Sequence, residues 1–127
     1  MPQTYDTDAL LALAEQLDKL VEDLPIERQM EKDQARQLMN LGQGLGAAAS
    51  NLRLMAVQAI LAETTTPVAA LTAATQQARE VIARIQAVSQ LITIVGDVLV
   101  LAQVVATQRW GLVPPAFKNL KAALAPV

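Results

Sequence analysis

The segment Thr66–Trp110, TPVAALTAATQQAREVIARIQAVSQLITIVGDVLVLAQVVATQRW, has no proline after its second residue and only one glycine. Thr66 can cap a helix, and Pro67 suits the first helical position because the N–H that proline lacks has no partner there. Gly111 can take the left-handed conformation that ends a helix, and the two prolines that follow prevent its continuation. The segment therefore predicts one helix over about 67–110, roughly 65 Å long.

Apolar residues in this segment recur at alternating steps of three and four. The series is Leu71, Ala74, Ala78, Val81, Ile85, Val88, Ile92, Val95, Leu99, Ala102 and Ala106. Such a seven-residue repeat is typical of helices packed nearly parallel in a coiled-coil-like bundle. From 91 to 106 the helix is apolar nearly all round, so this half needs cover on more than one side.

A shorter amphipathic helix is predicted near the start of the chain, at about 8–24. Its leucines repeat the three-four spacing: Leu10, Leu13, Leu17, Leu20 and Leu24. Charged side chains such as Glu15 and Asp18 fall on the opposite side. Pro25 ends this helix and can occupy the first position of the next one.

A second long helix is predicted over about 26–63, with an apolar seam from Leu38 to Ala62. Its weak point is the run Gly42-Gln43-Gly44-Leu45-Gly46, because each glycine costs roughly 1 kcal/mol relative to alanine. The seam passes through the glycines in phase, so we expect one helix that is bent or loosened there. A break into two helices is the alternative.

The expected fold is all-α, with residues 1–127 forming a single helical-bundle domain. A tight connection at 63–66 would make helices 26–63 and 67–110 an elongated antiparallel hairpin. The helix at about 8–24 would complete a three-helix bundle at one end and leave a bare two-helix tip at the other. A short C-terminal helix, with Phe117, Leu120 and Leu124 on one side, would cover the three-helix end or another subunit.

Composition excludes several kinds of active site. The chain has no cysteine and no histidine, so it has no thiolate zinc site, no disulfide and no Ser–His or Cys–His pair. The glycine run at 42–46 lacks the lysine and the Ser or Thr of a phosphate-binding loop. We therefore expect a protein that is not an enzyme and that has no metal site and no cofactor.

Charge is unevenly distributed along the chain. Residues 1–40 hold nine acids and four bases, whereas residues 41–127 hold three acids and six bases. We expect the acidic N-terminal helices to pack near the basic C-terminal segment that holds Arg109, Lys118 and Lys121. A dedicated electrostatic site for a partner is the alternative. The net charge of −2 provides no strong field to attract nucleic acid, and none is expected as a partner.

The run Leu91–Ala106 raises the question of a membrane, but it is shorter than the roughly 20 residues that span a bilayer. Asp97 would add about 3 kcal/mol at the midplane. Residues 1–8 are polar and acidic, unlike the start of a signal peptide, so a cytoplasmic protein is expected.

A second apolar stripe beside the seam of helix 26–63 suggests an interface, because large apolar patches on soluble proteins commonly mark partner sites. The candidate interface residues are Leu54, Val57 and Leu61, together with Val100, Leu101 and Val104 on helix 67–110. The expected function is a protein–protein interaction module of the adaptor, assembly or accessory-chaperone type. It would form a homodimer or larger oligomer through a four-helix bundle at the hairpin end, with another helical protein as a further possible partner. The alternative is an amphipathic hairpin that acts at a membrane or lipid surface.

Overall fold

The computed structural model of the 127-residue chain describes residues 3–4, 7–24, 30–58, 61–62, 68–85, 87–107 and 109–125. Within these residues the chain is an all-α bundle, as predicted. Its helices are α1 (Thr7–Asp23), α2 (Lys32–Gln58), α3 (Val68–Ile82), α4 (Val88–Ala106) and α5 (Val113–Leu124). A short 3-10 helix, η1 (Trp110–Leu112), precedes α5. The two-residue strands β1 (Gln3–Thr4) and β2 (Leu61–Ala62) pair antiparallel.

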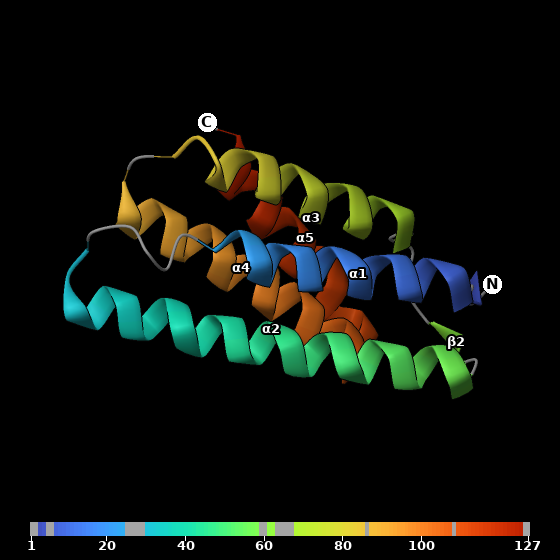
Figure 1. The fold of residues 1–127 in the computed structure, drawn as a ribbon. Helices are drawn as coiled ribbons and strands as arrows, with labels where there is room; N and C mark the ends of the chain where they lie inside the picture. The colour runs from blue at the N-terminus through green and yellow to red at the C-terminus, as the bar shows by residue number, and fades with distance from the viewer. Residues whose placement is uncertain are drawn as a thin grey trace.

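The helices form two layers. In Figure 1, α3, α1 and α2 lie side by side in front, and α4 and α5 lie behind them. α1 packs on both α2 and α3, while α4 packs on α2 and α5, and α5 also contacts α3. This arrangement covers α4 on several sides, as its apolar composition requires.

α1 matches its prediction closely, since it was expected at about 8–24 and spans Thr7–Asp23. The predicted leucine series is buried in full: Leu10, Leu13, Leu17, Leu20 and Leu24. The three-four spacing places these side chains on one stripe, which faces the space between α2 and α3.

α2 passes through the glycine run without a break, as expected. Two of its three glycines lie where a neighbouring side chain approaches closely. A Cβ atom at Gly44 would lie 2.9 Å from Leu99 Cδ2 of α4, and one at Gly42 would lie 3.3 Å from Leu24 Cδ1, next to α1. The predicted range of about 26–63 is wrong at both ends. Residues 30 and 31 are not helical and α2 begins at Lys32, and it ends at Gln58, with Leu61 already in a strand.

The prediction of one helix over 67–110 is wrong, because two helices, α3 and α4, occupy this range. The break lies in Ala83–Ala87, which contains neither proline nor glycine. Arg84 N–H bonds to the Val81 carbonyl at 3.0 Å in a tightened last turn, and Ala87 is extended. Tertiary packing overrides local helix propensity here, since a straight rod would leave most of the α4 surface without cover.

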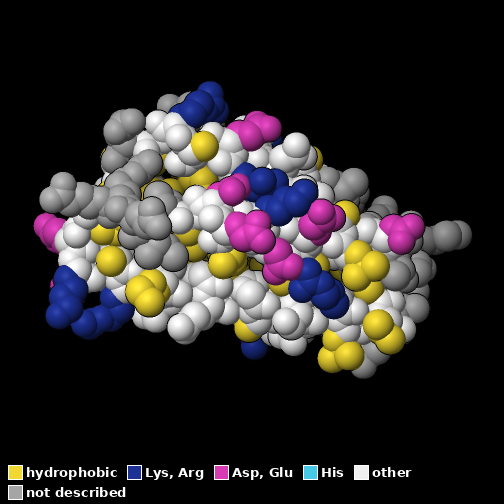
Figure 2. Space-filling view, viewed as in Figure 1, with side chains coloured by type: hydrophobic (Ala, Val, Ile, Leu, Met, Phe, Trp, Pro, Cys, Tyr) yellow, Lys and Arg dark blue, Asp and Glu magenta, His cyan; other side chains and the backbone are white. Residues whose placement is uncertain are grey.

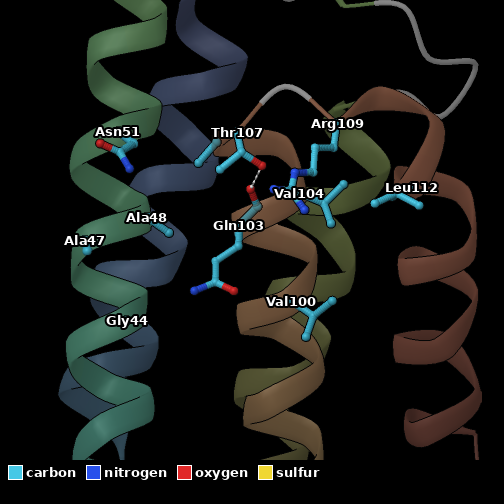
Figure 3. A pocket seen from close by; sticks show the side chains of 11 residues that line it. Gly44, Ala47, Ala48, Asn51, Val100, Gln103, Val104, Thr107, Arg109 and Leu112 are labelled. Carbon is cyan, nitrogen blue, oxygen red and sulfur yellow. Dashed lines mark hydrogen bonds between the residues drawn. The ribbon is translucent and has the colours of Figure 1, made fainter.

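The predicted antiparallel hairpin of α2 and α3 is also wrong. α1 lies between these two helices, and α2 packs instead on α4, to which it runs parallel (Figures 1 and 3). Because α2 ends early, nine residues rather than the predicted three lie between it and α3, and the β2 strand among them pairs with β1. The longer connection can cross the width of α1, about 10 Å. The expected bare two-helix tip is therefore absent from the described part of the chain.

Candidate functional site

Two features of the surface are candidates for function. One is a set of exposed aliphatic side chains, Leu11, Leu54 and Val57, which we call the terminal patch; their exposed fractions are 41%, 56% and 83%. The other is a groove between α2 and α4. Both involve α2.

The terminal patch lies at one end of the α1–α2 layer. The salt bridge between Asp18 and Arg53 shows which residues of these antiparallel helices lie opposite each other. Leu11 is two turns from Asp18 and Val57 is one turn from Arg53, in the same direction along the bundle. Figure 2 shows hydrophobic side chains gathered at the right-hand end of this face, beyond the charged groups.

The six predicted interface residues differ in their exposure to solvent. Leu54, Val57 and Val100 are exposed. Leu101 and Val104 are only 2% and 8% exposed, so the fold already covers most of both side chains, although Val104 still lines the groove between α2 and α4. They were expected on an open face because the break before α4, which lets α5 and α2 pack around it, was not foreseen. Leu61 forms part of β2, and its side chain lies outside the described residues.

The groove has a volume of about 460 Å³ and is shown in Figure 3. Its lining is Gly44, Ala47, Ala48 and Asn51 from α2, Val100, Gln103, Val104 and Ala106 from α4, and Thr107, Arg109 and Leu112 beyond α4. The lining residues of α2 lie on one face of the helix, from Gly44 to Asn51, so the groove runs along two turns, roughly 10 Å. It exists because the α2 side chains are too short to fill the space opposite Val100 and Val104.

One end of the groove is lined by Thr107, Arg109 and Leu112, which follow α4. Thr107 N–H donates to the Gln103 carbonyl at 2.9 Å, and the Thr107 hydroxyl donates to the same oxygen at 2.6 Å. Arg109 N–H donates to the Val104 carbonyl at 2.9 Å, and the Arg109 carbonyl accepts from Leu112 N–H at 2.9 Å. The backbone of Arg109 is thus held on both sides.

The groove side of the molecule carries little charge. No charged residue occurs between Arg36 and Arg53, and Asp97 is the only one between Arg84 and Arg109. The expected packing of acidic α1 against the basic C-terminal segment does not occur among the described residues. The acids of α1 instead reach Arg53 on α2 and Arg79 on α3.

Asp97 lies half-buried on α4, and burial raises the pKa of its carboxyl above the ordinary value of 3.8. The cause is loss of hydration of the charged form. An acid at this position opposes the otherwise apolar character of α4.

Among the described residues, no group of three or more acidic side chains is close enough to hold a metal ion. The buried hydroxyl of Thr75 donates to the Leu71 carbonyl at 2.9 Å, so it is satisfied within α3. α4, with 19 residues and a mean hydropathy of 1.9, is long and apolar enough to cross a membrane, a property that core helices of soluble proteins share.

Comparisons of this chain with protein-family models, with curated proteins and with solved structures found no match. Sequence reasoning did not identify the groove, because it did not place α2 beside a parallel α4. The available signals were the run of small residues at 42–49 and the absence of charge around it.

Proposed function

We propose that this chain is a non-enzymatic protein–protein interaction module that self-associates through the terminal patch. The supporting observation is the exposure of Leu54 and Val57 on one side of α2, next to Leu11 of α1. Exposed aliphatic groups gathered in one place are characteristic of sites that a partner covers. In a twofold dimer, the same patch on each copy would pack against the other and form a four-helix bundle from two copies of α1 and α2.

The free energy gained by burying the terminal patch in a dimer favours reversible association. Fully burying a valine or leucine side chain contributes about 1.5–3 kcal/mol. These side chains are already partly covered, so six of them across a dimer would contribute roughly 6–12 kcal/mol. Association costs about 4–15 kcal/mol in lost freedom of motion. We therefore expect a dimer whose population depends on protein concentration.

Light scattering after size exclusion, over a concentration series, tests this proposal. The expected result is a mass that rises toward twice the monomer as concentration increases. The double variant Leu54→Glu with Val57→Glu should stay monomeric and keep its helical circular dichroism. Met39→Glu is the matched control, because Met39 is exposed on the same helix outside the patch. A wild-type chain that is monomeric throughout, or a double variant that still dimerises, would refute the proposal.

The second candidate function, action at a lipid surface, is favoured by one observation: the length and apolar character of α4. In the folded chain α4 packs on α2 and α5, so lipid contact would require these helices to separate. Flotation with vesicles of neutral and anionic lipid tests this alternative. If wild type co-floats with vesicles and the patch variant co-floats equally, the lipid function is favoured over self-association.

A further inference from the structure

The lining of the groove combines a long apolar surface with one positive end. Gly44, Ala47 and Ala48 form one wall, and Val100 and Val104 form most of the other. A volume of about 460 Å³ is within the range of about 300–1,000 Å³ that small-molecule sites occupy. Such sites are mostly apolar, with a few polar groups placed to orient the ligand.

The positive end is Arg109, which the backbone holds in place. In Figure 3 its side chain extends alongside Val104, with the amides of Asn51 and Gln103 on the helices on either side of the groove. Among the described residues, no salt bridge joins a carboxylate to Arg109. From Val98 to Val127 the sequence contains no acid at all.

A guanidinium binds a carboxylate through two parallel N–H···O bonds. The amide side chains offer further donors. The remaining length of the groove has no charge, so it suits an unbranched apolar tail rather than a second polar group. Charge and shape together therefore specify an amphipathic anion.

We propose that the α2–α4 groove binds a small amphipathic carboxylate, with the carboxylate on Arg109 and the apolar tail between Ala47 and Val100. This site is separate from the terminal patch and does not depend on self-association. Arg109 would contact the ligand directly, whereas Val104 and Leu112 would position Arg109 through their backbone hydrogen bonds to it.

Octanoate is a suitable probe, because it is soluble and its tail can lie along two helical turns. Titration monitored by methyl NMR should shift the signals of Ala47, Ala48 and Val100 in a saturable manner. Octylammonium, with the same tail and the opposite charge, should bind at least about threefold more weakly. Arg109→Gln should weaken octanoate binding to a similar extent and remove the preference over octylammonium.

Ala47→Leu is the variant that blocks the groove, since Ala47 is exposed and a larger side chain there does not enter the core. We expect it to abolish the octanoate shifts at Val100. The matched control is Ala12→Leu, at an exposed alanine of α1 away from the groove, which should bind octanoate like wild type.

Three results would overturn this proposal: no saturable shift in wild type, equal binding of octanoate and octylammonium, or full binding by Ala47→Leu. The competing role for Arg109 is purely structural, because a cation near the C-terminus of α4 offsets the helix dipole. In that case Arg109→Gln would lower the melting temperature but leave the octanoate affinity unchanged. The mass of each variant by light scattering separates this outcome from failure of the proposed self-association.

Discussion

α2 packs against two neighbours by opposite means. On the α1 side, large leucines fill the interior and charged groups tie the helices at the surface, as in the pair of Asp18 with Arg53. On the α4 side, Gly44 and its alanine neighbours bring the backbones close, and no charged pair joins the two helices among the described residues. Both contacts are extensive.

The difference has a direct physical consequence. Leucine side chains interdigitate on the α1 side of α2, and the hollow that remains there, beside Gly42 and Leu24, has a volume of about 250 Å³ and is smaller than the groove on the α4 side. Glycine and alanine allow a close approach at one point but cannot fill the space beyond it, so a groove remains beside Val100. The α1 contact should therefore be sensitive to lost volume, and the α4 contact to added volume.

The largest effect should come from the buried leucines of α1. Leu17 is fully buried, so Leu17→Ala should lower the free energy of unfolding by about 2–5 kcal/mol, through lost burial and the cavity that remains. Leu11→Ala, at an exposed position of the same helix, should change it by less than about 0.5 kcal/mol. Urea unfolding of both variants measures the difference. Similar losses of unfolding free energy would show that the contact between α1 and α2 does not depend on the volume of its buried leucines.

On the α4 side, added volume should matter next. Gly44→Leu should destabilise the fold by about 1–3 kcal/mol, because the new side chain would overlap Leu99. Gly46→Ala is the matched control, since a Cβ there meets nothing within 4 Å, and alanine should stabilise α2 by about 1 kcal/mol. If thermal unfolding moves in the same direction for both, the close approach at Gly44 is not what shapes this contact.

Asp97 provides a test of the uncharged character of the α4 side. Its folded-state pKa is raised, so the native state holds its proton more tightly and stability falls as pH rises through and above 3.8. The loss is complete above the folded-state pKa and absent below the ordinary value. Asp97→Asn should therefore raise the melting temperature at pH 7 and leave it unchanged at pH 3. A gain that persists at pH 3 would mean that burial of the charge is not the cause.

The smallest effect should come from the surface charges on the α1 side. Removing the pair of Asp18 and Arg53 with Asp18→Asn should cost at most about 1 kcal/mol, because both side chains are exposed to solvent and screened by salt. Added salt should reduce the difference between wild type and variant. A loss as large as that of Leu17→Ala would show that charges, rather than leucines, hold α1 in place.

Residue spacing was enough to predict three features of the fold. These are the all-α class, the bounds and buried face of α1, and the continuity of α2 through its glycines. They depend on local periodicity, which a single helix carries by itself. Exposure of Leu54 and Val57 was likewise predictable, because both fall off the main seam of α2.

Tertiary structure alone decided three features of the fold. These are the break at 83–87, the place of α1 between α2 and α3, and the parallel pairing of α2 with α4. No residue in the break disfavours a helix, so only the gain from covering α4 on several sides makes the chain turn there. The groove and the position of Arg109 beside it follow from that turn. The seven-residue repeat specifies which face of each helix is buried. It does not specify which helix packs on that face, because one apolar face can pack against many others.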